Sequence, residues 1–247
     1  MKRPVPPADL ELVVCRCGEE MGWLRNVPRG LRVTVYEKTP GPAAAWPGSI
    51  PLPNVGREAH AWLHHLAERY DSLAEWTLFA QGHPFDHVPD MHGVIRRLAG
   101  HPPAGEDFLW LGFLWETDDS RGHPSFVHWT KNPLRRELDL AGFFRSLWNE
   151  PVPDRVRYVG GGQFAVSRKA AHRRTRDFYE RALLLASEFP DAAHAFERTW
   201  DRVFLAPPLD PRLFGPSGMR LLKPVRKKAA EESSGRRGGG SGTPLQG

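Results

Sequence analysis

Residues 54–87 have the sequence NVGREAHAWLHHLAERYDSLAEWTLFAQGHPFDH, which predicts a helix, a turn, a buried strand and a polar loop. Apolar side chains at steps of three and four positions share one face of the predicted helix, namely Ala59, Trp62, Leu63, Leu66, Ala67 and Tyr70. Asn54 stands where its side-chain oxygen could cap the first free backbone N–H groups. His64 and His65 fall on the polar sides of this helix and are expected to face solvent. The run WTLFA at residues 76–80 has the length and hydrophobicity of a buried strand.

The polar loop that follows, QGHPFDH at residues 81–87, carries more side-chain chemistry than a connection needs. Loops that leave the carboxyl ends of strands in an α/β sheet are the usual place for a ligand. Gln81, Asp86 and His87 are therefore candidate site residues, with Asp86 or His87 as a general base that takes a proton from a hydroxyl group. The structural alternative is that Asp86 caps the next turn and His87 hydrogen-bonds a buried carbonyl group.

The composition narrows the class of protein. The 247 residues suit one domain of ordinary size with a tail. There is no apolar run near the ~20 residues that a membrane-spanning helix needs, and the amino terminus lacks the apolar stretch of a secretory signal. Cys15 and Cys17 lie on the same side of a predicted strand, which excludes a disulfide framework and favours a reducing compartment. We expect no transmembrane segment and a cytoplasmic location.

The net charge of +5 comes mainly from the end of the chain. Lysines and arginines from Lys223 onward supply most of the excess, and Lys2 and Arg3 supply the remainder. A nearly neutral body argues against a nucleic-acid partner. We predict three parts: a flexible lead (residues 1–8), an α/β domain (9–222) and a disordered, basic, Gly/Ser-rich tail (223–247).

Strand and helix patterns alternate along the predicted domain. Strands are expected at residues 10–17, 32–38, 76–80 and 108–115, and across 157–168, where three glycines interrupt the strand. Helices are expected at residues 91–98 and 138–148, and two more helices, with apolar faces over 178–189 and 193–204, end the domain. This alternation predicts a single three-layer α/β domain with a mostly parallel mixed sheet.

Five blocks of sequence, in this order, resemble the domain-of-unknown-function family 3431: CRCGEEMGWL at 15–24, NVGREAH at 54–60, FAQGHPFDH at 79–87, GQFAVSR at 162–168 and ERTW at 197–200. The resemblance covers roughly residues 10–205. That family resembles glycosyltransferases with the nucleotide-diphospho-sugar transferase fold, whose first strand and early loop hold the nucleotide. The resemblance implies this fold, a nucleotide-sugar donor and a glycan-type acceptor.

Nucleotide-binding candidates lie after the first strand and at the start of the central helix. A carboxylate at Glu19 could accept hydrogen bonds from a base or a ribose, although a glutamate also suits the first turn of a helix. Asn54, Arg57 and His60 lie at or near a helix amino terminus, where an arginine and free N–H groups can bind a diphosphate. The alternative for Arg57 is a structural ion pair with Glu58.

The last two blocks supply further candidates. Gln163 and Arg168 follow the glycines, and in such transferases this segment lies near the acceptor. Arg168 could neutralise a leaving phosphate, or it could pair with Asp177 or Glu180 on the next helix. Glu197 is expected to hold an arginine of the scaffold, the alternative being that it reaches the site.

One departure concerns the metal. Such transferases often carry an Asp-x-Asp pair that holds a divalent cation, whereas after its buried strand this chain has AQGH. Two substitutes are conceivable: Asp86 with His87 or His83, or the pair Glu116 and Asp118. Mn²⁺ or Mg²⁺ would prefer these oxygen ligands.

Three functions follow from these observations. The first is a glycosyltransferase-like enzyme that uses a nucleotide-activated sugar, with Asp86 or His87 as base and Arg57 or Arg168 on the phosphate. The second is a catalytically silent module that binds a carbohydrate or a nucleotide. The third is a metal-dependent hydrolase.

Overall fold

The computed structural model describes residues 9–41 and 45–222. The predicted lead (1–8) and tail (223–247) lie outside this part of the chain. Within these two ranges, no helix has both the length and the hydrophobicity that crossing a bilayer requires.

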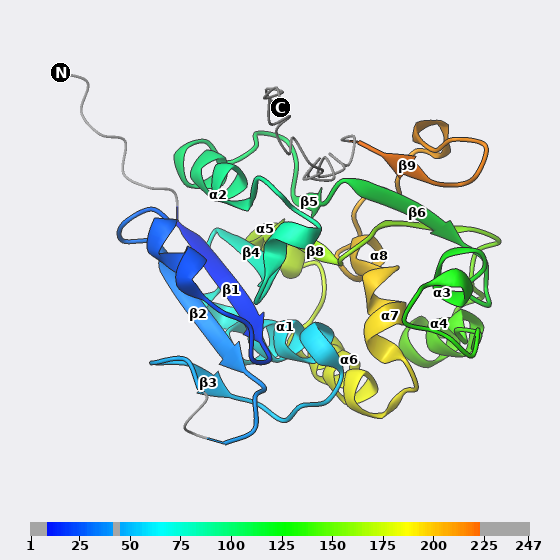
Figure 1. The fold of residues 1–247 in the computed structure, drawn as a ribbon, viewed down its shortest axis with the longest axis horizontal. Coiled ribbons are helices and arrows are strands. Elements are labelled where there is room, and N and C mark those ends of the chain that lie inside the picture. Colours follow the sequence, from blue (N-terminus) through cyan, green and yellow to red (C-terminus); the bar gives the residue numbers. More distant parts are fainter. Residues whose placement is uncertain (1–8, 42–44, 223–247) are drawn as a thin grey trace, which may run out of the picture.

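A six-stranded mixed sheet forms the centre of the molecule (Figure 1). β1 pairs in parallel with β2 and β4, whereas β8 runs antiparallel between β4 and β5. The predicted α/β class with a mixed sheet is therefore confirmed. In spatial order the strands are β3 (Ile50–Pro51), β2 (Arg32–Glu37), β1 (Leu10–Arg16), β4 (Trp76–Gln81), β8 (Gln163–Ser167) and β5 (Phe108–Leu111).

Both faces of this sheet are covered, because successive side chains of a strand point to opposite faces. Val13 belongs to the core on the side of α1, and Val14 belongs to the core on the side of α2. One face is covered by α1 (Arg57–Glu68), α6 (Arg176–Glu188) and α7 (Ala192–Glu197), and the other by α2 (Met91–Gly100) and the 3₁₀ helix η1 (Gly22–Asn26) (Figure 1). The result is three layers.

A second, three-stranded sheet continues from the β5 edge (Figure 1). It has the order β7 (Val156–Val159), β6 (Leu114–Asp118) and β9 (Arg220–Leu221), with antiparallel pairs. The prediction of a single strand at residues 108–115 is wrong. This range is divided between β5 and β6, which belong to different sheets. The predicted strand at 157–168 is likewise two strands. Gly161 and Gly162, between them, adopt φ values of 90° and 60°, which turn the chain.

The remaining described elements are short connections apart from one longer helix. They are α3 (Ser125–His128), α4 (Leu140–Trp148), α5 (Arg168–Ala171), α8 (Trp200–Val203) and the 3₁₀ helices η3 (Tyr70–Ser72), η4 (Pro84–Asp86) and η5 (Pro211–Leu213).

Two expectations about the central helix are wrong. Asn54 does not cap α1: the residue before the helix is Gly56, with φ of 58°, and no side chain caps the helix. His65 does not face solvent but is fully buried, with Nδ1 3.1 Å from the Tyr36 hydroxyl. The reason is that α1 packs against α6 and α7 as well as the sheet, so more than one of its faces is covered.

Candidate functional site

A cavity of about 160 Å³ lies at the carboxyl end of β4, and we call it the sheet-edge cavity. It is bounded by the start of α1, the loop after β4, strand β6, the glycine loop at residues 160–162, and α7. Five of the residues singled out from the sequence line it: Arg57, Gln81, His87, Glu116 and Glu197.

The cavity occupies the place that the topology favours for a ligand. After β1, the chain forms β2 and β3 on one side of β1 within the sheet. It then crosses over and forms β4 on the other side of β1. Ligands in open α/β sheets bind outside the carboxyl ends of the strands at such a switch point. Gln81, the last residue of β4, lines the cavity, and its Nε2 donates to Glu58 Oε1 on α1 at 3.3 Å.

Gln163 links β8 to the carboxyl end of β4 and to the loop after it through side-chain hydrogen bonds. It is fully buried at the start of β8 and does not line the cavity. Its Oε1 accepts from the backbone N–H of Gln81 at 3.2 Å, and its Nε2 donates to the carbonyl of Pro84 at 3.1 Å. Gln163 therefore positions the loop after β4.

Arg57 lies at the mouth of the cavity, with about half of its side chain exposed. Its backbone has φ of 48°, a conformation that is uncommon for a residue other than glycine. The predicted alternative of an ion pair is present, because Nε lies 3.5 Å from Glu58 Oε2. One guanidinium nitrogen also lies 3.5 Å from Nε2 of His194 on α7.

Glu197, at the end of α7, carries an ionised carboxylate. Its Oε1 accepts from the backbone N–H of Gly161 at 2.6 Å, and its Oε2 lies 3.3 Å from an Arg198 nitrogen and 3.7 Å from His194 Nδ1. Burial alone would raise the pKa of Glu197. Hydrogen bonding with His194, the charge of Arg198 and the Gly161 N–H outweigh burial and lower this pKa to about 2.

Glu116, on β6, has the opposite shift. Burial, assisted by repulsion from Glu197, raises the pKa of Glu116 to about 7. The backbone of Gly160 lies directly against its carboxyl group, since a Cβ at Gly160 would come within 2.7 Å of Glu116 Oε2. Two carboxyl groups with pKa values moved apart thus line one cavity, an arrangement typical of acid–base sites.

One lining residue, Arg198, belongs to a buried ion pair. Arg198 donates from Nε to Asp118 Oδ2 at 2.8 Å and from another nitrogen to the Tyr158 hydroxyl at 2.9 Å. Asp118 also accepts from the backbone N–H groups of Ser125 at 2.5 Å and Phe126 at 3.3 Å. Arg198 and Asp118 are both almost fully buried, so Asp118 has a structural role here.

The predicted metal ligands do not come together. The oxygens of Asp118 already accept hydrogen bonds, and Asp86 lies outside the cavity with 78% of its side chain exposed. The nearest charged partner of Asp86 is His83, whose Nε2 is 3.6 Å away. In the part of the chain that the structure describes, no group of three or more His, Cys, Asp and Glu side chains is arranged to hold a metal ion. Among the described residues, therefore, neither Asp86 with His83 or His87 nor Glu116 with Asp118 forms such a ligand set for Mn²⁺ or Mg²⁺.

Other predicted residues lie near the cavity but do not line it. Glu19 accepts from the backbone N–H of Cys17 at 2.5 Å and lies against Gly82 in the loop after β4. His60 is buried on α1, where burial and the neighbouring Lys38 lower its pKa to about 4. Asn54 is exposed before α1.

The predicted position of Arg168 near the phosphate is wrong. Because β8 runs antiparallel to β4, the residue after β8 lies at the opposite edge of the sheet. There Arg168 donates to Asp9 Oδ2 at 3.1 Å, and its backbone N–H donates to the carbonyl of Glu75. Arg168 cannot share a phosphate with Arg57, and its partner is neither Asp177 nor Glu180.

Sequence reasoning missed two features of the cavity. His194 stands three positions before Glu197 on α7, a spacing that places both side chains on one helix face. Phe126 and Trp129 contribute aromatic rings, each about 5 Å from the His194 ring between centroids. No motif marks these residues, since their meeting depends on the packing of α3 against α7.

The comparisons with known proteins give one match. The family model described as Protein of unknown function (DUF3431) matches residues 12–212, a range that includes every residue lining the sheet-edge cavity. No curated protein and no solved structure matches the chain.

Proposed function

This chain belongs to the family described as Protein of unknown function (DUF3431), and we propose that it is a glycosyltransferase-like enzyme acting at the sheet-edge cavity. The donor would be a nucleotide-activated sugar and the acceptor a hydroxyl group, on the nucleotide-diphospho-sugar transferase fold. The observation that carries the proposal is the pair Glu116 and Glu197, whose pKa values are shifted in opposite directions inside one cavity.

Glu116 acts as the general base in this proposal. With a pKa of about 7, its carboxylate is available near neutral pH and still basic enough to take a proton. It removes the proton of the acceptor hydroxyl while that oxygen forms a bond to the anomeric carbon. The bond from this carbon to the diphosphate breaks, and the nucleoside diphosphate leaves with the electron pair. Glu116 replaces Asp86, which lies outside the cavity.

The surrounding residues support binding. Arg57 offers a partly exposed guanidinium group to a leaving diphosphate. Gln81 and Glu58 offer an amide and a carboxylate to sugar hydroxyl groups. Glu197 remains ionised and holds the Gly161 backbone. The position beside the β1–β4 switch point supports a ligand at this edge.

A catalytically silent binding module is the alternative. It is favoured by the lack of a metal-ligand set among the described residues, because many nucleotide-sugar enzymes would need a cation to neutralise the diphosphate. The silent module predicts that ligand binds without turnover. A hydrolase predicts product without any acceptor.

The test is an assay of the full-length protein against a panel of nucleotide sugars, with and without glycan acceptors, that detects released nucleoside diphosphate. Once a substrate pair is found, Glu116→Gln is expected to lower kcat about 10²–10⁴-fold, the usual effect of removing a general base. The matched control is Glu180→Gln, on the exposed face of α6 and outside the cavity.

Each result has a defined meaning. Acceptor-dependent release that is lost in Glu116→Gln and kept in Glu180→Gln supports the transferase. Unchanged kcat in a folded Glu116→Gln protein contradicts Glu116 as base. A shift of the thermal midpoint by a nucleotide sugar, without release of product, indicates the binding module.

A further inference from the structure

Large apolar side chains that are exposed to solvent are concentrated in residues 213–222, at the edge of the second sheet. Leu213, Met219, Leu221 and Leu222 have between 36% and 55% of their surface exposed. Arg220 and Leu221 form β9, the edge strand, and Leu213 adjoins it because a guanidinium nitrogen of Arg220 donates to the Leu213 carbonyl at 3.1 Å. We call these five residues the β9 surface.

The neighbouring strand extends this apolar area. Leu114 on β6 is paired with Leu221, and paired residues of an antiparallel sheet have their side chains on the same face. The backbone N–H of Leu222 donates to the carbonyl of Phe113 at 2.8 Å, and both Phe113 and Leu114 are only partly buried. Leu114 also lines the sheet-edge cavity, so the β9 surface lies beside that cavity.

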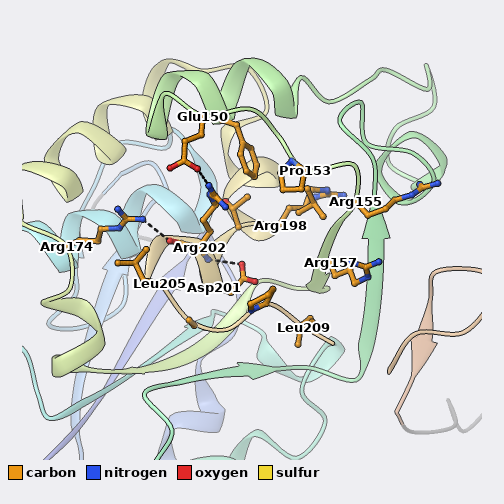
Figure 2. Close-up of a pocket in the computed structure, with 15 residues that line it drawn as sticks. Glu150, Pro153, Arg155, Arg157, Arg174, Arg198, Asp201, Arg202, Leu205 and Leu209 are labelled. Atoms are coloured by element: carbon orange, nitrogen blue, oxygen red, sulfur yellow. Dashed lines mark hydrogen bonds and ion pairs between the residues drawn. The ribbon is translucent and has the colours of Figure 1, made fainter. Parts of the chain in front are cut away.

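Positive charge accompanies these apolar side chains. Arg155 and Arg157 point away from the cavity that Figure 2 shows. They line instead a hollow of about 320 Å³ that extends to Phe214, and none of the described residues that line this hollow is acidic. The guanidinium carbon of Arg157 lies 5.9 Å from the centroid of the Phe214 ring. Among the described residues, neither Arg157 nor Arg220 makes an ion pair, so both keep an uncompensated charge.

The sequence after the β9 surface adds further cations. The first acidic residue beyond β9 is Glu231, and four basic residues precede it: Lys223, Arg226, Lys227 and Lys228. Exposed apolar side chains mark surfaces that bind proteins or membranes, and a neighbouring group of lysines and arginines favours a membrane with anionic lipids. The charge of this part of the chain is therefore complementary to such a membrane.

A second copy of the chain fits this surface less well. β9 has only two residues, so its free edge offers few backbone groups to a strand from another copy. A symmetric contact would also bring the cations of the two copies together, and like charges oppose such a contact.

We propose that the β9 surface docks on a membrane that contains anionic phospholipids. Its apolar side chains enter the boundary between the lipid headgroups and the acyl chains. Arg157, Arg220 and the cations after Leu222 pair with the negative groups of the lipids. This docking does not depend on the proposed glycosyl transfer, because it uses residues outside the sheet-edge cavity.

The test is flotation of the full chain at pH 7 with unilamellar vesicles of phosphatidylcholine alone, or of phosphatidylcholine with ~30% phosphatidylserine. The protein is expected to bind the anionic vesicles about tenfold or more tightly than the neutral ones, and about 0.5 M salt is expected to weaken this binding. Arg157→Gln with Arg220→Gln should weaken binding to the anionic vesicles about tenfold. Equal binding to both kinds of vesicle, or binding to neither, overturns the proposal.

Variants of the apolar residues locate the docking surface. Leu221→Ser with Leu222→Ser is expected to weaken binding to the anionic vesicles about tenfold or more, and Met219→Ser alone should weaken it in the same direction. The matched control is Leu134→Ser with Leu184→Ser, which removes two leucines that are 81% and 61% exposed outside the β9 surface and should leave the binding unchanged. Circular dichroism checks that each variant is folded.

Two further results would contradict the proposal. If the double variant of Leu221 and Leu222 binds as the unmodified protein does, the basic residues alone account for binding and the β9 surface is not the docking face. If light scattering shows a dimer that this variant converts to a monomer, the β9 surface is an interface between copies of the chain.

Discussion

The raised pKa of Glu116 lowers the stability of the folded protein at high pH, because the folded environment disfavours the charged carboxylate. Its pKa of about 7 lies above the ordinary value of 4.5. Between these two values the folded state binds more protons than the unfolded state, so the stabilising contribution is present at low pH and is lost as the pH rises through about 7. The cost is therefore greatest above pH 7.

Replacing this carboxyl group tests that balance. Glu116→Gln is expected to raise the thermal midpoint at pH 8 relative to the unmodified protein, and to change it little at pH 5, where the acid is already neutral. Circular dichroism melts at the two pH values measure the difference. Equal changes at both values would contradict a raised pKa.

Three residues that line the cavity, Gln81, His87 and Arg57, could be predicted from the sequence because of their positions in strand and helix patterns. Gln81 and His87 follow a buried strand, and Arg57 begins a helix, positions that face ligands in α/β sheets. Asp86, the other base candidate and the neighbour of His87, lies outside the cavity. It ends the 3₁₀ helix η4, in which successive residues point about 120° apart, so one neighbour can line a cavity while the other faces water.

At the scale of elements, the loop between β7 and β8 brings its backbone against the ring of His87. A Cβ at Gly161 would lie 2.3 Å from His87 Cγ, and the φ of Gly161 is 90°. Both the left-handed conformation and the contact therefore require glycine. Because the Gly161 N–H also binds Glu197, this loop joins three parts of the site.

A pair of alanine variants separates these two requirements. Gly30 has a similar φ of 81°, but a Cβ there would meet nothing within 4 Å. Gly30→Ala is expected to lose about 1–2 kcal/mol of unfolding free energy from backbone strain alone. Gly161→Ala should lose at least about 1 kcal/mol more, because the new methyl group overlaps His87. Urea titrations compare the two, and equal losses would mean that the overlap relaxes without cost.

The local hydrophobic pattern predicted most helices and strands. It did not predict that the apolar run at residues 108–115 and the glycine-containing run at residues 157–168 each form two separate strands. Residues 108–115 look like one strand because every position is compatible with burial. The chain instead leaves one sheet at Leu111 and enters another at Leu114. Likewise, nothing near Glu116 in the sequence marks Glu197 as its partner, since the two meet only when β6 packs near α7.

At the scale of the whole molecule, a buried histidine makes stability depend on pH. Burial lowers the pKa of His65 to about 3, so the folded protein keeps it neutral while the unfolded chain takes up a proton below about pH 6.5. Stability is therefore full above this value and falls as the pH drops toward 3.

The size of this effect can be measured. Between pH 7 and pH 4, His65 is expected to cost about 3 kcal/mol of unfolding free energy. His65→Asn should flatten the pH dependence by a similar amount, whereas His128→Gln, on an exposed residue, should leave the slope unchanged. Urea unfolding at several pH values gives the slopes, and a slope in His65→Asn equal to that of the unmodified protein would contradict the interpretation.

The reversed strand β8 has a consequence for motion. It brings the incoming glycine loop to the same edge as the outgoing loop after β4, and Gln163 fastens the two together at Gln81 and Pro84. We therefore expect these two loops to stay together at this end of the sheet. Across the cavity, Asp118 accepts hydrogen bonds from the Ser125 N–H and from Arg198, which ties β6 to α3 and to the residue after α7.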